Sequence, residues 1–228
     1  MKWWILGACA LLVAVRTYSA DTALQQEAKM RDRDPLAQLV EPINSEVARL
    51  IRDPATTIER LSTPFLRNGL IFRAEWHGPY KPVGLTIGYA KQDNFTVLLP
   101  LNTAGFQELV AKAGVVLDSN EQRVAFAVTE LETTRCFDET FVVLRSFDEV
   151  RLMANPAAQD ETRFRAIREK YEPMVHMPRA DGAGPWEIPI YALSRNDLCL
   201  FTITLDALGN SKITKQILEA NTPLLPAG

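Results

Sequence analysis

Apolar residues recur at helical spacing near the start of the chain. Between residues 36 and 51 they return every three or four positions, as one buried face of a helix requires. Asp-Pro at 34–35 is typical of a helix start, and Pro42 should kink or split the helix. A second Asp-Pro pair at 53–54, followed by apolar positions at 58 and 61, predicts another short helix.

After residue 70 the apolar period changes to two. Residues 70–76, 83–89 and 95–99 alternate between apolar and other side chains, which predicts three strands joined by short turns. A helix over 103–113 follows, with Gly114 as its end. Further strands are predicted over residues 123–131, 140–146, 149–153, 186–193, 198–206 and 211–218, with a helix introduced by Pro156 between the third and fourth of these.

This order of elements predicts an α+β fold. Strands joined by short turns favour a mainly antiparallel sheet, with N-terminal helices and two further helices packed on it. No Pro/Gly-rich linker clearly divides the chain, so residues 35–228 are expected to form a single domain. Residues 21–34 are polar and are expected to be a flexible lead-in.

The first twenty residues read as a signal peptide. Lys2 precedes an apolar run of about 13 residues, 3–15, which suits the core of a leader and is short for a bilayer span. The leader could be cleaved after Ser19 or after Ala20. The same segment could instead be an uncleaved N-terminal anchor or a buried apolar helix. No later segment is long enough to cross a membrane. We therefore expect an exported protein, periplasmic or extracellular.

Composition and charge limit the classes of partner that this protein can bind. The 228 residues are 47% hydrophobic and 23% charged, which is typical of a soluble globular protein with a real core. The net charge is −3, and no run of Lys and Arg forms a basic stripe. Nucleic acid is therefore not expected as a partner, because its phosphates would need such a stripe.

The expected export also determines the expected redox state of the cysteines. Cys9 lies in the leader, which leaves Cys136 and Cys199 as a pair in an oxidising compartment, where a disulfide is the expected state. Two free buried thiols are the alternative. His77 and His176 could join the cysteines in a zinc site, but zinc ligands usually come in close pairs and these four do not. Neither a metal nor a cofactor is expected.

Motifs for catalysis are weak. The sequence has no glycine-rich phosphate loop and no nucleophile elbow. Carboxylates recur at 137–139 and 147–149, both Phe-Asp-Glu, and Glu130 and Glu132 would share one face of a predicted strand. A secreted hydrolase that uses such carboxylates, or Cys136 with a histidine base, is the alternative function. No catalytic residue is assigned.

Two aromatic loops are the most suggestive feature. Trp76, His77 and Tyr80 lie in one Gly/Pro-containing loop, and Trp186 follows another. Flat amphipathic rings at strand ends suit ligand binding, although a strand-terminal Trp also packs readily as core. We therefore expect a non-enzymatic binding or interaction module for a protein or small-molecule ligand that the sequence does not identify. Self-association as an envelope component is a further alternative, and the oligomeric state is open.

Overall fold

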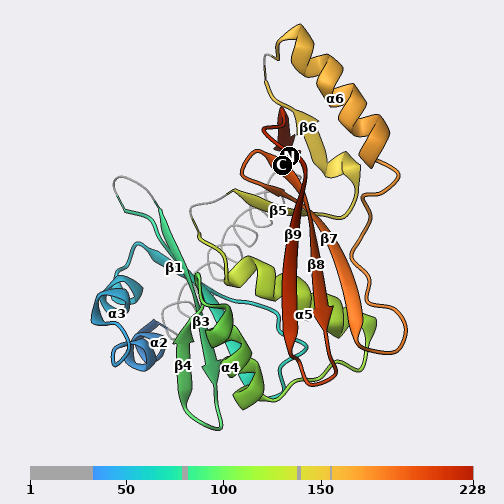
Figure 1. Cartoon of the computed structure of the whole chain (residues 1–228). Helices are drawn as coiled ribbons and strands as arrows, with labels where there is room; N and C mark the ends of the chain where they lie inside the picture. The colour runs from blue at the N-terminus through green and yellow to red at the C-terminus, as the bar shows by residue number, and fades with distance from the viewer. Residues whose placement is uncertain (1–32, 79–81, 138–139, 155, 228) are drawn as a thin grey trace, which may run out of the picture. The chain divides into compact units, whose positions relative to one another are not determined.

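The computed structural model describes residues 33–78, 82–137, 140–154 and 156–227 (Figure 1). The predicted leader and nearly all of the predicted lead-in lie outside these residues. The described residues form two compact units: residues 33–59 together with those between 74 and 82, and residues 60–73 together with those between 83 and 227. We call them the first and second unit and describe each by itself. The single domain expected over 35–228 stays a prediction.

The first unit contains two short helices, α2 (Arg33–Val40) and α3 (Ser45–Arg52), which pack against each other. Pro42 falls in the turn between them, so the predicted split is confirmed. The side chain of Asn44 caps α3 by accepting hydrogen bonds from the backbone N–H groups of residues 46 and 47. Helix α2 begins at Arg33, inside the segment that was expected to be a flexible lead-in.

The helix predicted after residue 53 is wrong, because this segment forms strand β1 (Thr56–Arg60). The Asp53 side chain accepts the N–H of Ala55 and the Asp53 carbonyl accepts the N–H of Thr56, which makes a turn where a helix start was expected. The β-branched residues that follow favour a strand. The N–H of His77 donates to the Ala55 carbonyl and ties this turn to the end of β2 (Gly69–Trp76).

One sheet has the strand order β1-β2-β3-β4, with β3 at Val83–Ala90 and β4 at Phe95–Leu98. Strands β3 and β4 are antiparallel, as expected. Helix α4 (Thr103–Ala113) follows, with an Asn102 side chain that accepts the N–H of Gly105 and with Gly114 as its C-cap. These elements confirm the predictions for residues 70–114.

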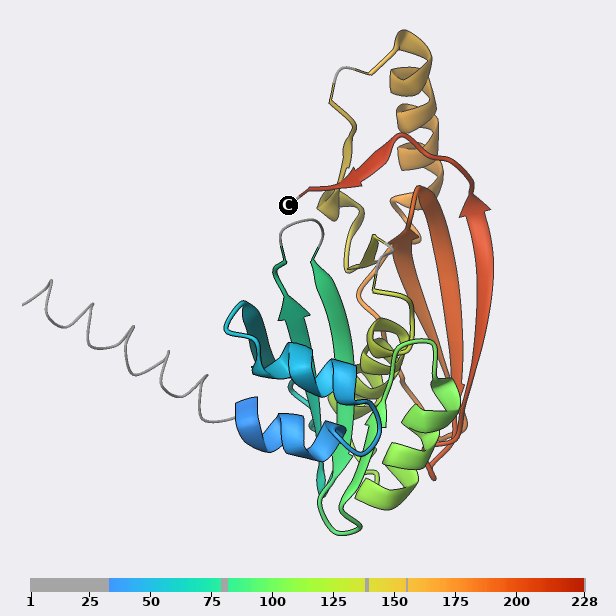
Figure 2. The ribbon, with the colours of Figure 1, turned by 90° about the vertical axis from the view of Figure 1, so that its left-hand side faces the viewer.

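The second sheet is antiparallel and has the order β5-β7-β8-β9. Its strands are β5 (Phe141–Leu144), β7 (Trp186–Ser194), β8 (Asp197–Leu205) and β9 (Ser211–Glu219). A short helical turn at Phe147–Glu149 leads to β6 (Val150–Leu152), which pairs with β10 (Leu224–Pro226). Helix α6 (Ala158–Tyr171) lies beside β6 and β10, as Figure 2 shows.

The strand predicted over 123–131 is also wrong, because residues Asn120–Thr133 form helix α5. The Ser119 hydroxyl accepts the N–H of Gln122, and the Gln122 side chain accepts the N–H of Ser119. This capping box fixes the first turn of the helix. The apolar residues that follow look alternating, but in the helix Phe126 and Ala127 are fully buried.

Two apolar clusters form the core of the second unit. The larger one joins β2, α4 and α5 to one face of the second sheet, and its centre is the aromatic group Phe65, Phe106 and Phe126. The smaller one lies on the other face of that sheet, against α6. The fold is therefore α+β with antiparallel sheets and N-terminal helices, and the described residues contain three further helices where two were expected. None of the helices in the described ranges has the length and apolar character that a membrane crossing needs.

Candidate binding groove beside strand β5

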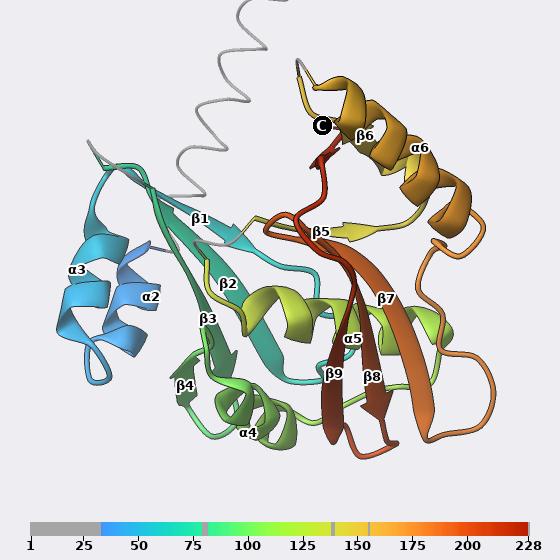
Figure 3. The same ribbon diagram turned by 45° about the horizontal axis from the view of Figure 1, so that its top comes forward.

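An apolar groove of about 1030 Å³ lies in the second unit between α5 and β5. Figures 1 and 3 both show β5 running alongside this helix. The last residues of the described chain close one part of the groove, and the segment after α6 closes another. Its apolar lining consists of Val124, Ala125 and Val128 from α5, Phe141, Val142 and Val143 from β5, and Met177, Pro178, Pro226 and Ala227.

The groove exists because α5 has two apolar faces. Phe126 and Ala127 turn into the core and are fully buried. Val124, Ala125 and Val128 also contact the core cluster but are only partly buried, and they line the groove. A helix that packs on one side only would carry polar residues there. The second apolar face of α5 is therefore surface available to a ligand.

Strand β5 forms one edge of its sheet, and its hydrogen-bond pattern shows which backbone groups face outwards. The N–H of Arg195 donates to the carbonyl of Thr140 at 2.7 Å. The register pairs Phe141 with Ser194, so Thr140 stands opposite Arg195 in a hydrogen-bonded pair. Such pairs alternate along an antiparallel ladder. Residues 142 and 144 therefore bond to β7, while the N–H and C=O groups of Phe141 and Val143 point away from it.

The backbone groups of β5 that point away from β7 differ in whether they have a hydrogen-bond partner. The next outward N–H along the strand, that of Arg145, donates to the Glu149 carboxylate at 2.8 Å, which closes that end of the edge. No hydrogen bond within the described ranges reaches the outward N–H or C=O of Phe141 or Val143. These two residues also line the groove. An open backbone edge and an apolar surface are thus present side by side.

The charges around the groove are mostly acidic. Glu121, Glu132 and Glu149 line it, and Arg145 is the one cation among the described residues that line it. The carboxylate of Glu132 lies 3.7 Å from the guanidinium of Arg73, at the long end of an ion pair. The groove therefore favours a ligand that is apolar along its length and basic at an end or along one side.

Trp186, one of the predicted ligand-binding residues, is 7% exposed and belongs to the core cluster. Its indole N–H donates to the carbonyl of Gly182 at 2.9 Å. The guanidinium of Arg123 lies over its ring at 4.2 Å, and Arg123 also donates to the carbonyls of Leu117 and Ala180. The ring and the N–H of Trp186 thus serve to join α5 to the loops around it.

Trp76 and His77, two further predicted ligand-binding residues, belong to the first unit. Trp76 ends β2 and is half-buried, and its buried indole nitrogen has no hydrogen-bond partner among the described residues. His77 is exposed. Gly78 lies against the Trp76 ring, where a Cβ would come within 2.0 Å of a ring carbon. Tyr80 lies outside the described residues. A binding role for these residues stays a prediction.

The predicted disulfide is absent, because Cys136 and Cys199 are both free thiols. Cys199 is fully buried on the core side of β8, with Ala192 and Ile217 as its cross-strand neighbours. Cys136 is half-buried in the loop after α5. Burial raises the pKa of the Cys199 thiol, which keeps it in the unreactive protonated form. The structure fits the alternative of two free thiols, but of these only Cys199 is buried, as that alternative expected of both.

The predicted carboxylate pair does not form, because Glu130 and Glu132 lie on a helix and not on one face of a strand. Residues two apart on a helix point to different sides. Glu130 is fully buried, whereas Glu132 is half-buried and faces the groove. Of the two Phe-Asp-Glu segments, Asp138 and Glu139 lie outside the described residues.

His176 contacts its own neighbour in the chain and a ring of strand β7. The Nδ1 atom of His176 lies 2.9 Å from the Met177 carbonyl, and its ring meets Tyr191 edge-on. No hydrogen bond joins His176 to Cys136 in the part of the chain that the structure describes. Nowhere in the described residues do three or more His, Cys, Asp or Glu side chains come together in a group that could hold a metal ion.

The groove was not predicted from the sequence, because residues 123–131 of α5 were predicted to form a strand. The signal that could have found it is the sequence Ser-Asn-Glu-Gln at 119–122, which has the spacing of a capping box. With a helix there, the apolar positions 124, 125 and 128 fall on one side of it. Comparison with known proteins finds no matching family model, no matching curated protein and no matching solved structure.

Proposed function

We propose that this protein is an exported, non-enzymatic binding module that holds an extended segment of a partner protein against β5. The segment adds to the sheet as a further strand and places alternate side chains in the groove beside α5. One observation carries the proposal: the outward backbone groups of Phe141 and Val143 are open, and they border an apolar groove of about 1030 Å³. Strand addition uses backbone bonds for affinity and such pockets for specificity.

The opposite edge of the same sheet is less suited to this role. Strand β9 carries Lys212 and Lys215, and the side chains along it are mostly exposed. Charged residues, lysine above all, are a common means of preventing pairing at a sheet edge. Strand β5 has the sequence Phe-Val-Val-Leu and carries no charge. The partner is therefore expected at β5 and not at β9.

The groove also limits the chemistry of the segment. Strand β5 has four residues and so offers roughly 13 Å of backbone for pairing, at about 3.3 Å per residue. A segment of about four to six residues fits, with β-branched or aromatic side chains at alternate positions. Because Glu121, Glu132 and Glu149 surround the groove, one or two basic residues in the segment add favourable charge interactions.

The test uses a synthetic probe, the blocked hexapeptide of alternating Val and Lys. We expect it to bind, and to slow hydrogen exchange of the Phe141 and Val143 amides at least ten-fold relative to the amides of β9. The same peptide with Glu in place of Lys is expected to bind more weakly. A probe methylated at its backbone nitrogens is expected not to bind, because it cannot pair with the strand.

Two variants at one position separate strand addition from simple apolar contact. Val143→Pro removes an N–H that points away from β7, so the ladder between β5 and β7 stays intact while pairing with the peptide is lost. Val143→Thr keeps the N–H and the size of the side chain and should retain most of the affinity. Equal binding by both variants would show that the peptide does not pair with β5.

The export part of the proposal rests on residues 1–20 alone. An intact mass of the protein recovered from the exported fraction tests it directly. A mass that lacks the first 19 or 20 residues supports export with cleavage of the leader. A full-length chain found only in the cytoplasmic fraction would contradict it, without bearing on the groove.

A further inference from the structure

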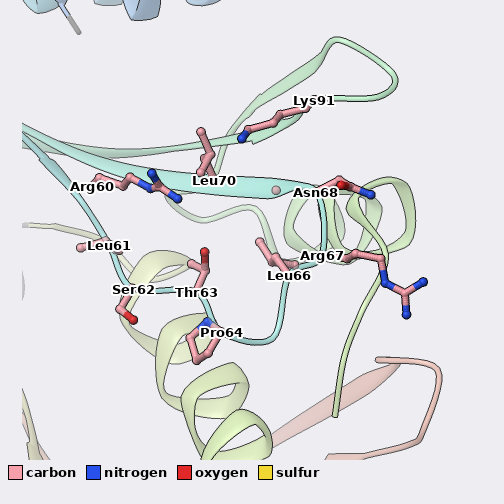
Figure 4. Close-up of a pocket in the computed structure, with 11 residues that line it drawn as sticks. Arg60, Leu61, Ser62, Thr63, Pro64, Leu66, Arg67, Asn68, Leu70 and Lys91 are labelled. Atoms are coloured by element: carbon pink, nitrogen blue, oxygen red, sulfur yellow. The ribbon is translucent and has the colours of Figure 1, made fainter. Parts of the chain in front are cut away.

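A second hollow in the second unit has the opposite charge. It measures about 460 Å³ and is formed by the segment 60–70 together with Lys91 (Figure 4). Among the described residues, Arg60, Arg67 and Lys91 line it, and no acidic residue does. In a chain with a net charge of −3, three cations around one hollow are a local reversal of sign. The hollow lies on elements other than α5 and β5, so it is independent of the groove.

The backbone that forms this hollow is fixed on several sides. The N–H of Arg67 donates to the Gly114 carbonyl at 2.9 Å, and the N–H of Asn68 donates to the Ala113 carbonyl at 3.0 Å. The N–H of Lys91 donates in turn to the carbonyl of Asn68 at 2.9 Å. These bonds hold the loop before β2 and the turn after β3 together, so the backbone from which Arg67 and Lys91 project is fixed before any ligand binds.

The side chains divide into two groups. Figure 4 shows Arg60 and Lys91 extending toward one another across Leu70, with the Thr63 hydroxyl directed into the same space. Arg67 extends away from them. None of the ion pairs within the described residues involves Arg60 or Lys91. Two free cations and a hydroxyl thus converge above an apolar side chain.

We propose that this hollow binds a small organic phosphate. The phosphate group lies between Arg60 and Lys91, where the guanidinium offers paired N–H donors and the ammonium a point charge, and Thr63 donates to a third oxygen. The hollow is larger than a phosphate ion needs, and Leu61, Pro64 and Leu70 line it as well. The organic part of the ligand contacts this apolar wall.

A phosphate group of this kind has two sources, a soluble metabolite or the headgroup of a phospholipid, and the binding chemistry is the same for both. Nucleic acid is a different matter. Its affinity depends on neutralising many phosphates along a stripe, and here the cations are confined to one hollow of about 460 Å³. The experiment therefore uses a soluble probe and a vesicle probe.

The soluble probe is phenyl phosphate, titrated into the whole protein at low salt and followed by the amide signals of residues 60–70 and 91. We expect saturable binding that inorganic phosphate reproduces more weakly and that phenol, which lacks the phosphate group, does not reproduce. Raising NaCl to about 0.5 M should weaken binding several-fold, because exposed charges are screened. The vesicle probe compares phosphatidic acid with phosphatidylcholine in sedimentation.

Three charge-removing variants test the assignment of residues. Arg60→Gln and Lys91→Gln should each weaken binding of phenyl phosphate at least ten-fold, and the double variant should abolish it. Arg67→Gln removes the same charge from the same rim but points away, so it should change the affinity less than three-fold. All three side chains are exposed, so the urea midpoint should not move and reports that each variant is folded.

The two probes and the three variants together distinguish a soluble ligand, a lipid headgroup and the absence of a site. Binding of phenyl phosphate with the expected order of variants supports a soluble ligand, and binding of phosphatidic acid vesicles alone, with the same order, supports a headgroup. Equal losses in Arg67→Gln and Arg60→Gln would show attraction by net charge only and would overturn the site. Failure of both probes to bind would overturn it as well, and neither result affects strand addition at β5.

Discussion

The hydroxyl oxygen of Ser211 lies 2.6 Å from both carboxylate oxygens of Glu130. The amide nitrogen of Gln107 donates to the same carboxylate at 2.9 Å and to the Ser211 oxygen at 2.8 Å. These three side chains come from the start of β9, from α5 and from α4. Glu130 is fully buried, so this small polar cluster joins three elements inside the core of the second unit.

Glu130 makes stability depend on pH. Loss of hydration raises its pKa above 4.5, and the hydrogen bonds from Ser211 and Gln107 only partly offset this. A carboxyl group with a raised pKa holds its proton more tightly in the folded chain. Unfolding therefore releases a proton between the ordinary and the raised pKa, and the free energy of unfolding falls as pH rises through that window.

The variant Glu130→Gln keeps both hydrogen bonds without the charge. We expect it to match the wild type near pH 4 and to become the more stable of the two as pH rises to 8. Urea unfolding at several pH values measures the difference. Glu187→Gln, at an exposed position on β7, corrects for the change in net charge. A difference that does not change with pH would contradict a raised pKa at Glu130.

The aromatic group at the centre of the core gives a second prediction. The Phe126 ring lies 5.3 Å from the rings of both Phe65 and Phe106, in edge-to-face geometry, and all three are fully buried. Phe126→Ala should lower the free energy of unfolding by about 3–5 kcal/mol, because it leaves a cavity. Leu208→Ala, at a side chain that is 77% exposed, should change it by less than about 0.5 kcal/mol. Chemical denaturation measures both.

Local sequence patterns predicted most of the helices and strands. They failed where packing in the tertiary structure determines the secondary structure. The strands with one buried face were found, because their apolar residues alternate. In α5 the apolar residues lie on two sides of the helix, one against the core and one along the groove, so the sequence reads as alternation. Ile58 in β1 and Leu61 just after it have helical spacing, but the turn at Asp53 starts a strand.

The capping box tests the local signal that was overlooked. Ser119→Ala removes the oxygen that accepts the Gln122 N–H at 3.2 Å and should lower the free energy of unfolding by about 1 kcal/mol. Ser119→Asp supplies another acceptor and should restore most of that loss. Equal stability of the two variants would show that the box does not hold the start of α5. Thermal or urea unfolding followed by circular dichroism measures the effect.

The candidate site could not be predicted in the same way, because it depends on tertiary structure. The open groups at Phe141 and Val143 follow from the register of β5 against β7, and the basic hollow follows from the meeting of residues 60–70 with Lys91. Neither arrangement leaves a local motif. Trp186 shows the converse, since this aromatic residue is conspicuous in the sequence and yet, at the start of β7, is only 7% exposed and donates its indole N–H to the Gly182 carbonyl.

The two thiols give the last prediction, and they differ in accessibility. Cys136 is half-buried, whereas Cys199 is fully buried and has a pKa raised by its burial. Iodoacetamide should therefore alkylate one thiol of the mature native protein, at Cys136, and a second only after denaturation. Intact mass after each step counts the adducts, and Cys136→Ser should remove the first. A chain that is alkylated neither before nor after denaturation would carry the disulfide and would contradict the free thiols, whereas rapid labelling of Cys199 in the native state would show that strand β8 opens.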